Sequence, residues 1–417
     1  MEIKNINNAV INRIKSNSSY FVISASVLLA RVLGGVITIL IIRSISSSEF
    51  AAFSTGFFIM TILGYSTTGL DKSFVFEYIH QNRENNDSLI ESYVWLKFII
   101  LVNLIIISIA ILYFALPYAR FNITLAMLGI LYSSSFWILT LILSMYQAKQ
   151  DFKKYGLVQI SFYMSVFVFV LLFMFIHGRT SYLFLLSYFI GIVGIIPFII
   201  PFRRIKISYY KNEVLRLLNL SKWLITSELC WLLFIRMDYF TVSRYLPKDV
   251  LGEYAIALRS INIVSVLIAS LSIYILPKVA EIRSDNQLNK FWKKSNFLTF
   301  SLFMLGVLIF IFSKQIITTL YGNDHSVAVR YFKSMIIAYA PMFFIPSFKY
   351  LILKFNNKIH YFLFNFILVL TYFVALPIFS MKISRVASPI YAKGAGFLIA
   401  LLYGVILYNS RDKKKLQ

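Results

Sequence analysis

The segment from Ser24 to Phe53, SASVLLARVLGGVITILIIRSISSSEFAAF, decides the fold of this chain. It is an apolar run that contains Arg31 and ends at a second arginine, Arg43, just before a short polar turn. At about 1.5 Å per residue, Arg31 lies near the middle of a hydrocarbon layer about 30 Å thick. A charge at that depth costs roughly 2.5–3.5 kcal/mol even on insertion scales. We therefore predict a membrane hairpin in which Arg31 meets water or a partner, whereas Arg43 is a topological anchor at the outer boundary.

The composition indicates an integral membrane protein. Of 417 residues, 59% are hydrophobic and only 14% are charged, whereas soluble domains carry about a quarter charged residues. The net charge of +24 would suggest nucleic acid in a soluble protein, but here it is explained by the basic residues that orient membrane spans, so no nucleic-acid partner is expected. The single cysteine excludes a disulfide within the chain, and no histidine pair has metal-ligand spacing. We expect no cofactor and no metal.

Apolar runs predict an all-α protein with twelve transmembrane helices. They lie near 20–42, 50–69, 92–115, 122–146, 156–177, 181–202, 219–241, 251–276, 296–320, 330–352, 360–380 and 387–408. The expected domains are an interfacial N-terminal segment (1–19), an N-lobe of six helices (20–202), a basic linker (203–218), a C-lobe of six helices (219–408) and a basic tail (409–417).

The distribution of basic residues orients these spans. Segments on the side of the termini hold 24 Lys and Arg, and the alternate segments hold 7. Because basic loops stay in the cytoplasm, both termini are predicted to be cytoplasmic. No outer loop is long enough to fold into a domain.

An internal repeat supports two lobes of the same orientation. Arg43-Ser-Ile45 matches Arg244-Tyr-Leu246, and the aromatic residues at 50–53 match 251–254, at a constant offset of 201. The same offset lays the first span over the seventh. Both would begin on the cytoplasmic side, as in transporters built from parallel repeats.

Intramembrane arginines are the candidate substrate-binding residues. Arg31 shares a helical face with Gly35 and Thr38, as expected for the wall of a wet cavity, and Arg236 and Arg259 lie within the seventh and eighth spans. The alternative for each is an ion pair between helices. Other basic residues near span ends are expected to extend toward the lipid headgroups; they are Lys97, Lys222, Lys349, Arg330 and Lys333.

Glu228 and Asp238, both in the seventh span, are the two acids predicted to lie well inside the membrane. Each could pair with an arginine, or could couple transport to a proton or sodium gradient. Glu228 is the better coupling candidate, whereas Asp238 is expected to form a structural pair near the outer rim.

This excess of basic over acidic residues favours an anionic substrate. Planar guanidinium groups bind phosphate oxygens in bidentate fashion and stay charged at any working pH. The sequence shows no nucleophile elbow, phosphate-binding glycine loop or catalytic carboxylate pair, so a transporter is expected rather than an enzyme.

Short motifs resemble the polysaccharide (O-antigen) flippases of the multidrug/oligosaccharidyl-lipid/polysaccharide exporter superfamily. Ala30-Arg31-Val-Leu-Gly34 looks like the first hairpin of that family, and Met237-Asp238-Tyr239 followed by Leu251-Gly-Glu-Tyr254 is similar to its second-lobe pattern. Ile275-Leu-Pro277 and Leu320-Tyr-Gly322 resemble later landmarks. Tyr239 departs from the family, which often has a basic residue there.

The resemblance implies a MATE-like flippase of the bacterial inner membrane. It would move an undecaprenyl-pyrophosphate-linked oligosaccharide, such as an O-antigen repeat unit, to the periplasmic leaflet by alternating access. Basic cavity residues, among them Arg31 and Arg259, would hold the pyrophosphate. Besides this substrate and membrane lipids, a polysaccharide polymerase and a chain-length regulator are expected partners.

Two rival functions remain open. A multidrug or cation exporter of the same fold should have an acidic cavity. A polysaccharide polymerase or ligase should have a sizeable catalytic loop on the outer face.

Overall fold

The chain is almost entirely helical in a computed structural model that describes residues 29–81, 87–115, 123–175, 180–202, 205–261, 284–355 and 358–410. These ranges hold no β-strand, which confirms the all-α prediction. The expected interfacial segment 1–19, the landmark at 275–277 and most of the basic tail lie outside the described residues.

The helices correspond to the expected spans, although three of them depart from the expected bounds. They are α2 (Ser47–Tyr65), α3 (Thr68–Gln81), α4 (Asp87–Ala115), α5 (Ile123–Ala148), α6 (Phe152–Phe175), α7 (Ser181–Ile190), α8 (Ile196–Ile199), α9 (Lys211–Val242), α11 (Asp285–Ile311), α12 (Ser313–Tyr321), α13 (Ser326–Ala338), α14 (Ile345–Phe355), α15 (Lys358–Lys382) and α16 (Ser388–Asn409). The three that depart are α3, α9 and α11. Two further helices are described over residues 29–44 and 248–261, and are called helix 29–44 and helix 248–261 below.

Most of these elements are long and apolar enough to cross a membrane. Eight helices of the described chain meet that test, and the two segments of α9, bent by 51° between Asn219 and Ser221, make a ninth. Helix 29–44, helix 248–261 and the interrupted run from α13 to α14 occupy the three other expected spans. The protein is therefore a multi-pass membrane protein.

Several spans are broken where proline or glycine falls inside them. The sixth span changes from α7 to the 3₁₀ segment η2 (Gly191–Ile195), to α8 and to η3 (Ile200–Phe202), and the tenth is interrupted by η4 (Ala340–Phe343). Pro341 lacks the backbone N–H that a continuous helix needs. At Gly194, a β-carbon would lie 2.3 Å from the Ser161 carbonyl oxygen, so η2 and α6 approach more closely than any other residue would permit.

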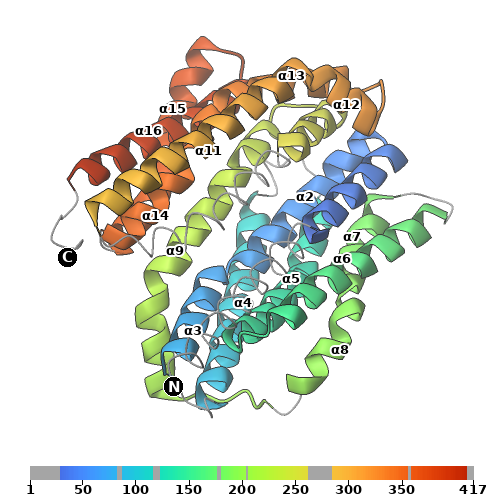
Figure 1. The fold of residues 1–417 in the computed structure, drawn as a ribbon. Coiled ribbons are helices and arrows are strands. Elements are labelled where there is room, and N and C mark those ends of the chain that lie inside the picture. The colour runs from blue at the N-terminus through green and yellow to red at the C-terminus, as the bar shows by residue number, and fades with distance from the viewer. Residues whose placement is uncertain are drawn as a thin grey trace, which may run out of the picture.

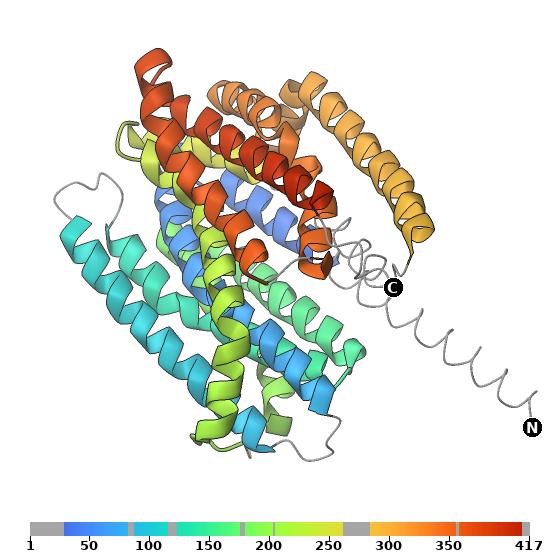
Figure 2. The same ribbon diagram turned by 90° about the vertical axis from the view of Figure 1, so that its left-hand side faces the viewer.

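The helices form two lobes. In the N-lobe, residues 29–202, α2 packs along α5, and α6 packs against α7 and η2; in the C-lobe, residues 211–410, α15 packs against both α16 and α9. The two groups lie side by side in Figures 1 and 2, and α9 runs along the boundary between them. The principal contact across the boundary joins α3 to α9.

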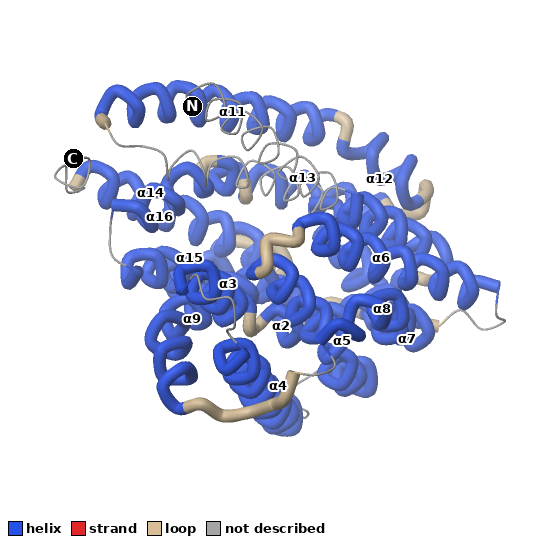
Figure 3. The backbone as a smooth tube through the Cα atoms, turned by 60° about the horizontal axis from the view of Figure 1, so that its bottom comes forward, coloured by secondary structure: helices blue, strands red, loops and turns tan. Residues whose placement is uncertain are grey.

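The outer surface of the helices suits lipid. Ile106, Ile107 and Ile111 of α4 and Phe297 and Phe300 of α11 are all more than half exposed. These two helices lie on opposite outer sides of the molecule (Figure 3). Large exposed apolar surfaces of this kind are stable in a bilayer, where no hydrophobic effect acts against them.

Candidate functional site

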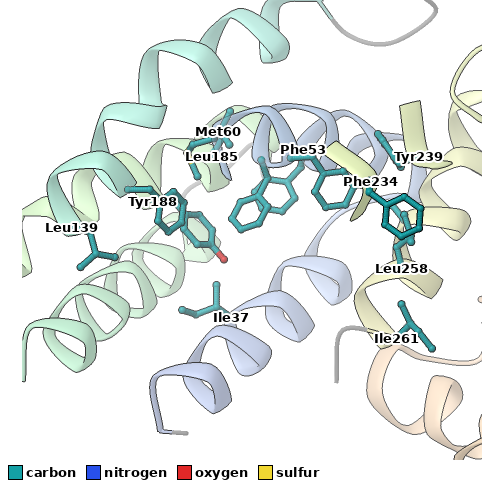
Figure 4. Packing of buried hydrophobic residues seen from close by; sticks show 14 of the residues in the cluster. Ile37, Phe53, Met60, Leu139, Leu185, Tyr188, Phe234, Tyr239, Leu258 and Ile261 are labelled. Atoms are coloured by element: carbon teal, nitrogen blue, oxygen red, sulfur yellow. The ribbon is translucent and has the colours of Figure 1, made fainter. Parts of the chain in front are cut away.

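Aromatic residues of α2 line the boundary between the lobes. Phe53 and Phe57 are one helical turn apart with ring centroids separated by 5.6 Å, and both are buried. Phe58 is fully buried beside them. Figure 4 shows Phe53 with Tyr188 of the N-lobe on one side and Tyr239 of the C-lobe on the other. This aromatic face is the part of the N-lobe that the C-lobe arginines contact.

Arg236 and Arg259 both place their guanidinium groups on these rings. The Cζ atom of Arg236, on α9, lies 4.2 Å from the centroid of Phe58. The Cζ atom of Arg259, on helix 248–261, lies 4.1 Å from the centroid of Phe57 and 5.1 Å from that of Phe58. A cation over a ring face at such distances is attracted by the ring quadrupole. Both charges therefore share Phe58, and each lies within the electrostatic range of the other.

The hydrogen-bonding edge of Arg259 is unsatisfied. Its Nε and Nη2 atoms are buried and donate to no acceptor in the described part of the chain. No ion pair links Arg236 or Arg259 to an acid there either. A buried donor without an acceptor costs about 1–3 kcal/mol, and more for a charged group. The stacked face of Arg259 thus leaves buried N–H groups that lack an acceptor in the described residues, and an anion would satisfy them.

Arg31 lies on the N-lobe side of the same region. Its electrostatic neighbours are Tyr65, Tyr155 and Tyr163, and the last of these interacts with Arg259 as well. Helix 29–44 packs beside α6 here, at a distance where a β-carbon on Gly34 would make an ordinary van der Waals contact of 3.5 Å with the Tyr163 ring. The structure therefore places Arg236 and Arg259 at the same ring, Phe58, and places Arg31 within the electrostatic range of Tyr163, which also interacts with Arg259.

Asp238 is enclosed in a buried ion pair of the C-lobe. Its Oδ1 atom accepts from Nζ of Lys393 at 3.0 Å, and its Oδ2 atom accepts from the hydroxyls of Tyr254 at 3.1 Å and Tyr339 at 2.8 Å. Lys393 also donates to the carbonyl oxygen of Ile235 at 2.7 Å. Both carboxylate oxygens are thus occupied by groups of the chain itself, as in the structural pair expected for Asp238.

Glu228 joins the two lobes at the end of the molecule where α3 meets α9. Its Oε1 atom accepts from Nζ of Lys72, on α3, at 2.8 Å and from the Tyr361 hydroxyl at 3.4 Å. Lys349, expected to extend to the headgroups, instead stacks on Trp231 and Tyr361 with Nζ 5.1 Å and 4.9 Å from their centroids. Headgroup contact was the wrong expectation for Lys349, because these rings and Glu228 surround its ammonium.

One buried site was missed at the sequence level. Nζ of Lys97 lies 2.6 Å from Oδ1 of Asp71 and 2.9 Å from the Thr140 hydroxyl, and the Tyr93 hydroxyl donates to the same carboxylate oxygen at 2.6 Å. The Lys97 side chain is 0% exposed, so the expectation that it reaches the headgroups was wrong. Asp71 lies beyond the expected end of the second span, near 69, but α3 continues from Thr68 to Gln81 after the short break at Ser66-Thr67.

This arrangement can bind an anion between the lobes. Two guanidinium groups, held by ring faces, present N–H edges that suit phosphate oxygens. The acids nearest to the boundary already have cationic partners of their own. The described residues contain no group of histidines, cysteines and acids able to hold a metal ion.

Comparisons with known proteins agree with this reading of the fold. A family model described as polysaccharide biosynthesis protein matches residues 17–283. Among solved structures, the lipid II flippase MurJ in an inward closed conformation is 18% identical, with 95% of this chain and 89% of that chain covered and a TM-score of 0.70. No curated protein sequence matches the chain.

Two further structures are similar. One is an inward-facing multidrug resistance MATE family transporter of the MOP superfamily, 13% identical, with 91% and 93% of the two chains covered and a TM-score of 0.68. The other is a MOP superfamily transporter from Pyrococcus furiosus, described as having a binding pocket of reverse polarity, 11% identical, with 94% and 95% covered and a TM-score of 0.66. The predicted MATE-like transporter fold is thereby confirmed.

Proposed function

The chain belongs to the polysaccharide biosynthesis protein family, and we propose that within it this protein is a flippase for a lipid-diphosphate-linked oligosaccharide. The substrate we propose is an undecaprenyl-pyrophosphate-linked repeat unit, such as that of O-antigen. It would be carried from the cytoplasmic to the periplasmic leaflet of the bacterial inner membrane, with both termini of the protein in the cytoplasm.

One observation carries this proposal: the paired guanidinium groups of Arg236 and Arg259 at the lobe boundary. Their faces lie on Phe57 and Phe58, and the Arg259 edge has no acceptor in the described chain. A diphosphate is the group on such a lipid carrier that would satisfy two adjacent guanidinium edges. The similarity of the fold to a lipid II flippase supports a lipid-linked substrate.

A cation exporter is the rival that shares this fold. It would need an uncompensated carboxylate within the membrane to attract its substrate. Asp71, Glu228 and Asp238 each have a lysine within 3.0 Å. The unpaired charges at the boundary are positive instead, which favours an anionic substrate.

Ion coupling is proposed at Glu228 rather than at Asp238. Asp238 is fully buried and is held by Lys393 and two tyrosines, so a proton or sodium ion would have to displace all three. Glu228 contacts Lys72, which is 56% exposed, and is therefore reachable from water. A polymerase and a chain-length regulator stay predicted partners.

Alanine substitution of the arginines tests the proposal. Losing a charge-assisted contact of about 1.5–3 kcal/mol weakens diphosphate binding roughly tenfold to hundredfold, so Arg259→Ala and Arg236→Ala should reduce transport while membrane insertion is kept. Lipid-linked repeat units would then accumulate on the cytoplasmic leaflet. Arg31→Ala is expected to do the same, and Arg31→Lys to be poorly tolerated if its contact is bidentate.

Arg330→Ala is the matched control, because Arg330 is exposed on α13. It should leave transport unchanged. Surface polysaccharide at the normal level in both Arg236→Ala and Arg259→Ala would remove these residues from the substrate site. Farnesyl diphosphate titrated onto the purified protein gives a second readout, and it should bind the wild-type chain and fail to bind the double alanine variant.

A further inference from the structure

The phenylalanine rings under the arginines are fixed on the N-lobe. Phe57 packs edge-on against Tyr188 with centroids 4.8 Å apart. Gly56, next to it, lies so close to α5 that a β-carbon there would come within 2.6 Å of the Leu125 carbonyl oxygen. The rings therefore move with the N-lobe, whereas both arginines belong to helices of the C-lobe.

Tyr239 fixes the other ring from the C-lobe side. Its ring meets Phe58 at 4.8 Å in an edge-to-face contact of 87°. Its hydroxyl donates to the Ala51 carbonyl oxygen at 2.7 Å and lies 3.0 Å from the Thr55 hydroxyl. These contacts set the direction of the Phe58 face and hold α2 against α9. The stacking of Arg236 and Arg259 is thus a contact between lobes that exists while the lobes are together.

We propose that Phe57 and Phe58 are the resting partners of the two arginines, which they hold when no diphosphate is bound and release when one enters. This inference rests on the proposed function. A flippase that moves a substrate in one direction must return empty, and then two adjacent cations lie at the lobe boundary with no anion. The ring faces stabilise each guanidinium without occupying its N–H edges.

Because the stacks join the two lobes, a diphosphate that binds the arginines as the lobes part binds in competition with the rings. Removing a ring face destabilises the empty state but takes nothing from the contacts to the diphosphate. Binding should therefore become tighter, while the return of the empty protein becomes slower. A ring that only filled space would not produce this pair of opposite effects, because a packing defect weakens both.

Phe57→Leu is the variant that tests this, measured by titrating farnesyl diphosphate onto the purified full-length protein. A desolvated stack implies a dissociation constant about twofold to thirtyfold lower than that of the wild type. Phe57→Tyr keeps the ring face, so its affinity for farnesyl diphosphate should equal that of the wild type. Phe50→Leu is the control. Phe50 is also buried on α2, and its ring contacts Phe53, whose centroid lies 6.0 Å from Cζ of Arg259; within the described residues no guanidinium stacks on Phe50 itself.

Weaker or unchanged binding by Phe57→Leu would overturn the proposal, and so would an equal gain in Phe50→Leu. A double-mutant cycle of Phe57→Leu with Arg259→Gln, read as thermal unfolding without ligand, tests the stack by itself and should be non-additive. Additivity there also overturns the proposal. If the wild-type chain binds no farnesyl diphosphate, the proposed function fails. If binding depends on Arg259 but is unchanged by Phe57→Leu, only the role proposed for the rings fails.

Discussion

Lys97 shows how a charged residue is kept inside this membrane protein. Its ammonium contacts Asp71 at 2.6 Å and Thr140 at 2.9 Å, and it lies 5.6 Å from the Tyr93 ring centroid. The Lys97 ammonium and the Tyr93 hydroxyl both donate to Oδ1 of Asp71, whereas Oδ2 of Asp71 is buried and accepts no hydrogen bond in the described part of the chain. Breaking such a pair from one side leaves an uncompensated buried charge, which is far more damaging than replacing both partners.

Lys97→Met should therefore lower the free energy of unfolding by about 3–5 kcal/mol. Adding Asp71→Leu should recover part of that loss, since no charge then remains buried. Thermal and denaturant unfolding of the purified protein measure both effects. Lys222→Met is the control at an exposed position of α9, and a loss in Lys97→Met no greater than in this control would contradict the account.

At the residue scale, the sequence predicted which charged residues matter better than it predicted the residues that they contact. Arg236 and Arg259 could be singled out because a guanidinium within a span is rare. Their shared ring could not be foreseen, since Phe58 lies on a helix far away in the chain. Lys97 was misplaced because depth was counted from the span ends, and such a count cannot reveal that Asp71 points at it.

Close helix approach at Gly252 controls how the lobes meet at the end formed by the start of α2 and the end of α12. A β-carbon there would lie 1.8 Å from the carbonyl oxygen of Ser47. The next residue, Glu253, accepts from the Ser47 hydroxyl at 2.8 Å and from the backbone N–H of Ala328 at 3.2 Å, and its Oε1 lies 2.8 Å from Nδ1 of His325. The glycine and the carboxylate together join α2 to the C-lobe.

Gly252→Ala should push helix 248–261 away from α2, because the obstacle is backbone that cannot rotate aside. Overpacking of this kind costs about 1–3 kcal/mol. Hydrogen exchange of the first turn of α2 should become faster, as the Ser47 contact is lost. Gly35→Ala is the control: nothing lies within 4 Å of its β-carbon, so it should be neutral or add up to about 1 kcal/mol through helix propensity. Equal exchange in the two variants would contradict the role of Gly252.

At the element scale, apolar length predicted where spans lie, and local chemistry decided how they break. The helix bounds agree with the expected runs to within a few residues at α5 and α16. The interruption at η4 was not predicted, because Pro341 falls inside the expected tenth span, 330–352, and apolar length alone does not show where a span breaks. The repeat at an offset of 201 matches residues 50–53 with 251–254, the segment that contains Gly252, and it stays a prediction.

The molecule as a whole is closed at both ends of the lobe boundary. At one end, Arg43 donates to the carbonyl oxygens of Thr319 at 2.5 Å and Leu320 at 2.8 Å, so the residue expected to anchor the topology also ties α12 to the N-lobe. At the other end, Lys72 contacts Glu228 at 2.8 Å, and Glu77 contacts Nε of Arg216 at 2.6 Å. Arg236 follows Glu228 on α9, and Arg259 follows Glu253 on helix 248–261, so both arginines belong to helices that carry contacts between the lobes.

The internal repeat predicted two lobes, but it did not predict the contacts that join the lobes at the two ends of their boundary. Each is made by residues about 130 to 280 positions apart that the repeat does not pair. Hydropathy shows which segments are in the membrane, and it carries no information on which faces of two lobes meet. Only the packing of α3 on α9 reveals that Glu228, a coupling candidate, is also a contact between lobes.

Reversing the charges of the Lys72–Glu228 pair tests whether this contact holds the lobes together. Lys72→Glu places two carboxylates face to face and should loosen the end where α3 meets α9. Because Lys72 is 56% exposed, the effect is expected at about 0.2–1 kcal/mol, which corresponds to exchange roughly 1.5-fold to fivefold faster in α3. Adding Glu228→Lys restores an opposite-charge pair and should return exchange toward the wild-type rate, as followed by mass spectrometry of peptides from residues 68–81.

Lys154→Glu provides the comparison, because Lys154 pairs with Asp151 at 3.1 Å within the N-lobe and is similarly exposed, at 54%. Its reversal disturbs an ion pair whose lysine is similarly exposed but which does not cross the boundary, so α3 should exchange at the wild-type rate. The Lys72–Glu228 contact would not hold the lobes together if hydrogen exchange in α3 were as fast in the double variant, Lys72→Glu with Glu228→Lys, as in Lys72→Glu alone. The same conclusion would follow if Lys154→Glu accelerated hydrogen exchange in α3 equally. If the double variant restores the wild-type rate of hydrogen exchange that Lys72→Glu alone has lost, attraction between opposite charges keeps this end closed, whichever lobe carries the lysine.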